Sequence, residues 1–270
     1  MADSFVTNEN SMLILGIVGS LILICLSGVS STFGPLFAAL GAVCAILWGA
    51  NAISRVASYG LGTGVPSIGY MSLGGGIVSS LSGLIIAERF LSKSLGAVTA
   101  EYVGPIIALI IGLLIGLIIA VVAKKLIGMK IPVMIRCTAE LGGAAALSII
   151  GFSVAIAGSL NLTDILNTVV LTGMIGLLFI LNTMAIQHPY NACLGPNEDP
   201  VRTFKCACHT AFLSMTVVGI CAVLNLGYVS LPIIVLGLIC WIISFRSFVN
   251  ASYEDASEVK WSGLWPEVEQ

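Results

Sequence analysis

Charged side chains are scarce in this sequence. Only 9% of its 270 residues are Asp, Glu, Lys or Arg, whereas 58% are hydrophobic, and the mean hydropathy is +1.08. Soluble domains carry about 25% charged residues, and a soluble core cannot bury so large an apolar surface. The sequence carries no basic footprint for nucleic acid, and its formal net charge of -2 says little about partners, because most of the surface of such a chain faces lipid. The composition predicts an all-α, polytopic integral membrane protein.

The beginning of the chain lacks the features of a cleaved signal peptide. Asp3 and Glu9 precede the first apolar run, and neither a basic n-region nor a small-residue cleavage site is present. We therefore expect the first apolar run to remain as a membrane helix behind a short cytoplasmic N-terminus, residues 1–11.

Eight apolar runs are long enough to cross a membrane. A helix needs about 20 residues to span about 30 Å of hydrocarbon. The runs cover 12–30, 35–53, 67–87, 105–123, 138–160, 165–187, 207–225 and 229–248. They predict a transmembrane domain over 12–248, followed by an acidic tail over 249–270 that is cytoplasmic or lies at the membrane interface.

The basic residues are distributed unevenly over the loops of this topology. Arg89 and Lys93 fall on one side, and the other nine fall on the opposite side: Arg55, Lys124, Lys125, Lys130, Arg136, Arg202, Lys205, Arg246 and Lys260. Cytoplasmic loops of membrane proteins carry the excess of Lys and Arg. We therefore expect both chain termini on the cytoplasmic side of a cell membrane.

Glycine and proline recur at similar spacing near the ends of the runs. Gly34-Pro35 and Gly104-Pro105 open the second and fourth runs, and similar turns at 62–66 and 128–132 precede the third and fifth. The offsets are 70 and 66 residues. The spacing indicates a repeated helix pair, although Gly-Pro also ends helices where no repeat exists.

Gly112 and Gly116 form a G-x-x-x-G face in the fourth run. Small residues at this spacing let two helix backbones approach closely. The face is expected to pack either inside the chain or at a subunit interface.

An ionisable side chain within a membrane span is a candidate functional group, and Glu140 is the plain case here. A hard cation such as sodium needs carboxylate, hydroxyl and carbonyl oxygens, so Thr138 is a candidate helper. The alternative interpretation is an ion pair with Arg136, four residues earlier on the same helix. Asp164, in N-L-T-D, is expected either to cap the sixth span or to line an outer ion vestibule.

Two loops carry long, distinctive motifs. R-V-A-S-Y-G-L-G-T-G-V-P-S-I-G covers 55–69, and H-P-Y-N-A-C-L-G-P-N-E covers 188–198. With W-G-A at 48–50 and I-G-M-K-I-P at 127–132, they closely resemble the C subunit of the tetrahydromethanopterin S-methyltransferase of methanogenic archaea. The resemblance extends in span pattern over residues 12–250.

This resemblance implies membership of a membrane complex that moves a methyl group from methyl-tetrahydromethanopterin, or its sarcinapterin relative, to coenzyme M and exports sodium. It places the chain beside the D and E membrane subunits, with the A, B, F, G and H subunits as further partners. The corrinoid is expected on another subunit, so no cofactor and no catalytic residue are expected on this chain. Membrane lipid is a further expected partner, nucleic acid is not, and coenzyme M is a possible ligand.

Coenzyme M is a sulfonate thiol, so its site needs a cation and backbone N–H donors. Arg55 stands before an otherwise uncharged glycine-rich loop that contains Gly60, Gly62 and Gly64. Arg136 and Arg202 are candidate second cations. The alternative for each arginine is an anchoring role at the cytoplasmic membrane surface.

Cys206-Ala-Cys208-His209 raises the question of a metal site, because thiolate and imidazole suit zinc. The C-x-C-H spacing is not that of a structural zinc site, so we expect none.

Two alternatives to the methyltransferase subunit remain. The first is a free-standing secondary transporter or channel for a small anion. The second is a scaffold within the same complex.

Overall fold

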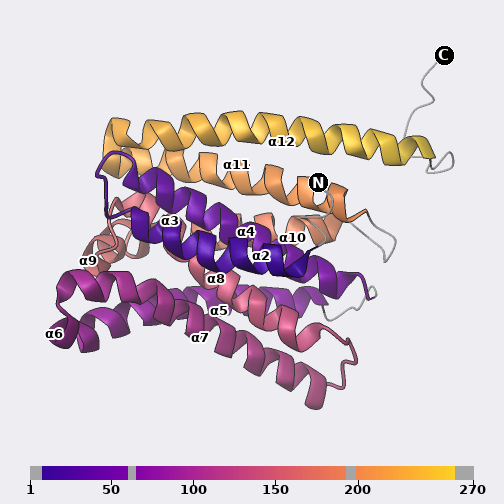
Figure 1. Cartoon of the computed structure of the whole chain (residues 1–270), viewed down its shortest axis with the longest axis horizontal. Coiled ribbons are helices and arrows are strands. Elements are labelled where there is room, and N and C mark those ends of the chain that lie inside the picture. The colour runs from indigo at the N-terminus through magenta and orange to yellow at the C-terminus, as the bar shows by residue number, and fades with distance from the viewer. Residues whose placement is uncertain (1–7, 60–64, 193–198, 259–270) are drawn as a thin grey trace.

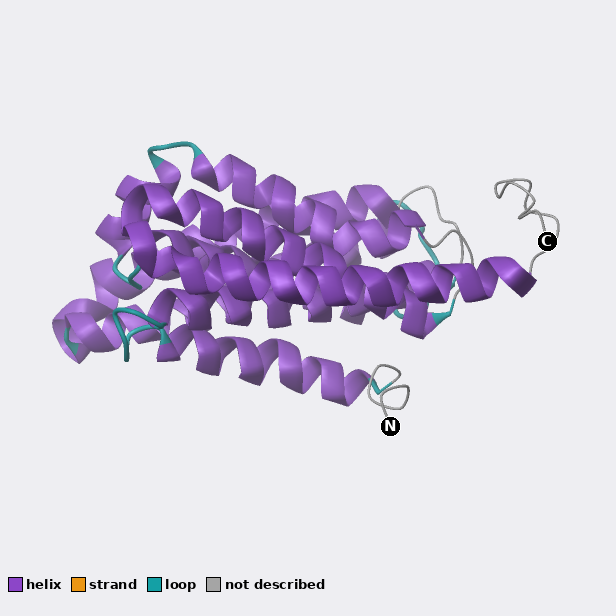
Figure 2. Cartoon of the chain, turned by 90° about the horizontal axis from the view of Figure 1, so that it is seen from above, coloured by secondary structure: helices purple, strands orange, loops and turns teal. Residues whose placement is uncertain are grey.

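The computed structural model describes residues 8–59, 65–192 and 199–258, and all regular secondary structure in these ranges is helical (Figure 1, Figure 2). The long helices lie alongside one another as a bundle. The expected all-α, polytopic fold is confirmed.

The bundle elements follow the apolar runs. In chain order they are α2 (Glu9–Ile14), η1 (Leu15–Gly19), α3 (Ser20–Leu26), α4 (Gly34–Ala57), α5 (Val65–Ile86), η2 (Ala87–Leu91), α6 (Ser92–Leu95), α7 (Ala97–Lys125), α8 (Met134–Ala157), α9 (Leu162–Ile165), η3 (Leu166–Val170), α10 (Met174–Ala192), α11 (Pro200–Leu226), η4 (Gly227–Ser230) and α12 (Leu231–Glu258).

Six helices in the described residues are long and apolar enough to cross a membrane, and a bent pair makes a seventh. That pair joins 162–170 to 174–187 at 83°. The last of the six, 200–254, extends over α11 and α12. These two helices are joined by η4 and lie side by side (Figure 1). Because α2 begins and α12 ends at the same end of the bundle (Figure 2), the chain crosses the bundle an even number of times. The count of eight spans stays a prediction.

The repeated helix pair is not reflected in the packing. α7 and α8 pack tightly on each other, whereas α4 and α5 make few contacts. Moreover, Pro105 lies inside α7 and does not open it, because 97–103 contains no helix breaker and continues the helix outward. A proline within a membrane helix is tolerated where neighbours satisfy the freed backbone groups.

The centre of the bundle is α8. Within its 18-residue apolar window, 94% of the residues are buried, and α4, α5 and α7 pack against it. A Cβ added to Gly112 of α7 would lie 2.5 Å from the carbonyl oxygen of Gly142 on α8, so glycine is required for this close approach. Gly116 meets the carbonyl of Thr138 in the same way. The G-x-x-x-G face therefore packs inside the chain.

Candidate functional site

The site is built around the carboxylate of Glu140, in the second turn of α8. Only 5% of this residue is exposed. An isolated charge at such a position would be costly, so its partners decide its role.

Three donors reach this carboxylate. Arg55 donates from Nη2 to Oε2, and Trp48 donates from Nε1 to the same oxygen at 3.1 Å. Arg136 donates from Nε to Oε1 at 2.8 Å. The expected pair between Arg136 and Glu140 is confirmed, and α4 supplies two more partners.

A second carboxylate, Glu9 at the start of α2, bridges the two arginines. Its Oε2 lies 3.2 Å from Arg55 Nη1 and 2.7 Å from Arg136 Nη1. Each guanidinium therefore contacts two carboxylates. We call Glu9, Arg55, Arg136 and Glu140 the Glu140 network; its formal charge is zero.

Exposure increases outward through the network. The exposed fraction of the side chain is 7% for Glu140 and 15% for Arg55, but 44% for Glu9 and 51% for Arg136. The inner pair is therefore shielded from solvent, where ionic interactions are strong, whereas the outer pair is accessible and more easily screened.

Helix geometry explains how α4 supplies both partners. Trp48 and Arg55 are seven residues apart, or about two turns, so their side chains lie on the same face of the helix. The ring of Trp48 is fully buried, and Gly16 of η1 packs directly against it. A Cβ on Gly16 would overlap the indole, so this glycine fixes how closely the N-terminal span approaches α4.

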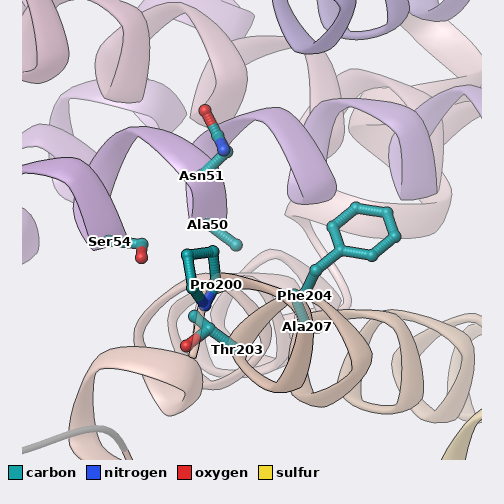
Figure 3. A pocket seen from close by; sticks show the side chains of 7 residues that line it. All are labelled: Ala50, Asn51, Ser54, Pro200, Thr203, Phe204 and Ala207. Carbon is teal, nitrogen blue, oxygen red and sulfur yellow. The ribbon is translucent and has the colours of Figure 1, made fainter. Parts of the chain in front are cut away.

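A small cavity lies between α4 and α11, beside Ser54 (Figure 3). Its volume is about 30 Å³, and its lining residues are Ala50, Asn51, Ser54, Pro200, Thr203, Phe204 and Ala207. Water needs about 10–15 Å³ of such volume, so one or two molecules fit. An organic sulfonate does not fit in this cavity.

The family of the chain is decided by its similarity to known proteins. The family model for the C subunit of tetrahydromethanopterin S-methyltransferase matches residues 2–269. This chain belongs to that family. The C subunits of Methanothermobacter thermautotrophicus and Methanothermobacter marburgensis are each 54% identical to it over 263 residues, which cover 97% of this chain and 94% of each relative. The C subunit of Methanosarcina mazei is 40% identical over the same shares.

The remaining candidate site residues in this member of the methyltransferase family do not gather in one place. Thr138 is buried, but it lies two residues from Glu140, and residues at that separation face different sides of a helix. Its carbonyl lies against Gly116 of α7, whereas Glu140 faces α4. Thr138 is therefore not beside the carboxylate that it was expected to assist.

Asp164 does not cap a helix as expected. Asn161 caps α9, because its Oδ1 accepts from the N–H groups of Thr163 at 2.9 Å and Asp164 at 3.4 Å. Asp164 instead accepts from Ser159 Oγ at 2.6 Å. Asp164 follows the C-terminal end of α8, whereas Glu140 lies in the second turn of that helix, so the two carboxylates lie at opposite ends of the bundle.

Among the anion-site candidates, the structure brings Arg55 and Arg136 together. Arg202 lies in the first turn of α11, where its N–H donates to the capping carboxylate of Asp199 at 3.1 Å. Gly60, Gly62 and Gly64 lie outside the described residues.

The C-A-C-H motif lies on α11. Cys206 Sγ is 3.9 Å from His209 Nε2, and the His209 ring packs on Phe245 and Phe248 of α12. The described residues contain no group of three metal-ligating side chains.

Two members of the site, Glu9 and Trp48, are not predicted from the sequence. The sequence marks Glu9 only as an acidic residue before the first span, and Trp48 only as part of the W-G-A motif. The seven-residue spacing from Trp48 to Arg55 is an available signal, since it places both on one face of α4.

Proposed function

We propose that this chain is a membrane subunit of a complex that transfers a methyl group from methyl-tetrahydromethanopterin, or methyl-tetrahydrosarcinapterin, to coenzyme M and exports sodium. Its family membership and its polytopic helical fold support this proposal. The D and E subunits are its membrane partners, and the corrinoid lies on a different subunit. Both termini lie in the cytoplasm, in accord with the start of α2 and the end of α12 at one end of the bundle.

The position of Glu9 carries the proposal for this chain's own part. The guanidinium groups of Arg55 and Arg136 hold its half-exposed carboxylate. Arg202 lies at the same end of the bundle, because its neighbour Thr203 and Ser54 of α4 line one small cavity. The sulfonate of coenzyme M has the same charge and equivalent acceptor oxygens. In the proposed mechanism it replaces Glu9 between Arg55 and Arg136, because paired arginines bind oxyanions with charge-assisted hydrogen bonds.

The same exchange links the anion to a cation site. Arg55 serves both Glu9 and Glu140, so an anion that draws Arg55 outward removes part of the compensation of Glu140. Glu140 then attracts a cation to the buried end of the network. This reciprocal use of one arginine is the proposed coupling between coenzyme M and sodium.

The test is sodium-dependent methyl transfer to coenzyme M by the whole complex in proteoliposomes, with KM measured for both solutes. Arg55→Ala should raise the KM for coenzyme M at least tenfold, the loss expected for charge-assisted hydrogen bonds of about 1.5–3 kcal/mol. Glu9→Gln should lower it, because the competing carboxylate is removed. Glu140→Gln should raise the sodium concentration required.

Lys124→Ala is the matched control, since Lys124 is an exposed cation in the last turn of α7. Arg55→Lys retains the charge but not the two-sided contact, so it separates charge from geometry if Arg55→Ala fails to assemble. Unchanged KM values in assembled Arg55 and Glu140 variants would refute the proposal and favour a scaffold.

A further inference from the structure

A second, larger cavity shares the lining residue Phe204 with the small one. It is a groove of about 300 Å³ between α11 and α12. Its α11 wall includes Lys205, Cys208 and Phe212, and its α12 wall includes Cys240 and Ser244. Residues three or four apart lie on one helix face, so each wall is a continuous stripe.

The dimensions of the groove suit an extended chain. The α11 wall runs from Phe204 to Phe212, a rise of about 12 Å. A helix about 10 Å wide and of that length occupies roughly 900 Å³, more than the empty space of about 620 Å³ in the groove. A partner helix could therefore place only side chains in the groove, whereas a segment of an alkyl chain fits within it.

The side chains that line the groove change from apolar at one end to charged at the other. Phe212 and Cys240 line one end, and Lys205 lies at the other, in the second turn of α11. That turn is at the end of the bundle that also holds Arg55, because Ser54 of α4 and Thr203 of α11 line the same small cavity. An apolar groove with an ammonium group at the membrane surface complements a lipid with a negative headgroup.

We propose that this groove binds one alkyl chain of a membrane lipid with an anionic headgroup, and that Lys205 holds the headgroup. The lipid then fills the seam of the α11–α12 hairpin beside Phe204, the residue shared with the small cavity. This inference is independent of the proposed function, because it requires only the membrane location of the chain.

Native mass spectrometry of the delipidated complex can test the site, with dioleoylphosphatidylglycerol and dioleoylphosphatidylcholine as probes. Phosphatidylglycerol should bind more tightly. Lys205→Ala should weaken the binding of phosphatidylglycerol about fivefold, the factor for one cation near an anionic surface. It should leave the binding of phosphatidylcholine unchanged. Ser244→Trp should remove both lipids from the site by filling it, and Lys124→Ala should change neither.

Alkylation of Cys240 by N-ethylmaleimide gives a second readout, because its thiol lines the groove. Phosphatidylglycerol should protect Cys240 in the wild-type complex and protect it less in Lys205→Ala. Equal binding of the two lipids, or unchanged phosphatidylglycerol binding in Lys205→Ala, would overturn the proposal. Protection of Cys240 in the fully delipidated complex would overturn it as well, because a neighbouring subunit would then cover the groove.

Discussion

The two ends of the bundle hold their carboxylates by different means. At one end, Glu140 and Glu9 are bound by two arginines. At the other, Glu101 of α7 accepts from Asn161 Nδ2 at 2.9 Å, and Asp164 accepts from Ser159 Oγ at 2.6 Å. The first arrangement combines full charges with the burial of Glu140, whereas the second combines neutral donors with an exposed Asp164.

The two ends of the bundle differ in what the loss of a partner costs. A buried charge that loses its partner is strongly destabilising, so the Glu140 end ties α2, α4 and α8 to one another. A hydrogen bond between a carboxylate and a neutral group near solvent can be replaced by water at small cost. Loss of a partner of the buried Glu140 carboxylate therefore has a larger effect on the bundle than a change at Asp164.

The largest expected effect is the loss of Glu140. Glu140→Ala leaves two arginines with one carboxylate, and we expect it to destabilise the chain by about 3–5 kcal/mol. Asp164→Ala should cost about 0.5–1.5 kcal/mol. Denaturant titration of the purified complex would compare them. Equal losses at the two ends would remove the distinction between them.

The free energy of interaction between Arg55 and Glu140 gives a second test of the difference between the two ends. If Arg55 and Glu140 act as a unit, the double variant Arg55→Ala/Glu140→Ala should be more stable than the sum of the two single losses predicts, by about 1–3 kcal/mol. Additive losses would show that the two side chains contribute separately.

A packing change should be next in size. Gly16→Val places a side chain within the ring of Trp48, which donates to Glu140, and overpacking typically costs about 1–3 kcal/mol. Gly19→Ala, in the same helical segment, is the control, since its Cβ would lie 3.7 Å from Leu15 Cδ1, an ordinary contact. The same denaturant titration measures both. A Gly16→Val chain as stable as Gly19→Ala would mean that the N-terminal span moves aside freely.

How much of this could be predicted from the sequence depends on the range of each interaction. The pair of Arg136 and Glu140 follows from a spacing of four residues within one helix. The contact of α4 with α8 could not be predicted, because membrane helices that are apolar on every face carry no periodic signal for a buried side. The contact of Glu9 with the two arginines could not be predicted either, because it depends on the path of a separate helix, α2.

The expectation that Asp164 caps a helix was wrong for a local reason. Asn161 and Asp164 both have side-chain oxygens suited to capping, and they stand only three residues apart. The helix begins one turn earlier than expected, so Asn161 has the capping position and Asp164 lies in the first turn.

Loss of this cap should have a moderate effect. Asn161→Ala removes two capping hydrogen bonds and the contact with Glu101, and we expect a loss of about 1 kcal/mol. Asn161→Asp retains the capping oxygen but places a second carboxylate beside Glu101. It should therefore be less stable than the wild type at low salt, and high salt, which screens the repulsion, should reduce the difference. A difference that does not change with salt in denaturant titrations would exclude this contact with Glu101.

The smallest expected effect belongs to the outer carboxylate of the Glu140 network. Glu9→Gln removes a half-exposed charge, and exposed ion pairs contribute about 0.2–1 kcal/mol, which salt reduces. Its destabilisation should shrink as the salt concentration rises, whereas that of Glu140→Ala should persist, because the inner carboxylate is shielded from solvent. Denaturant titrations of both variants at low and high salt would measure this contrast. If Glu9→Gln were as destabilising as Glu140→Ala at every salt concentration, Glu9 would be a structural anchor of the bundle, and its exchange for a soluble anion would be untenable.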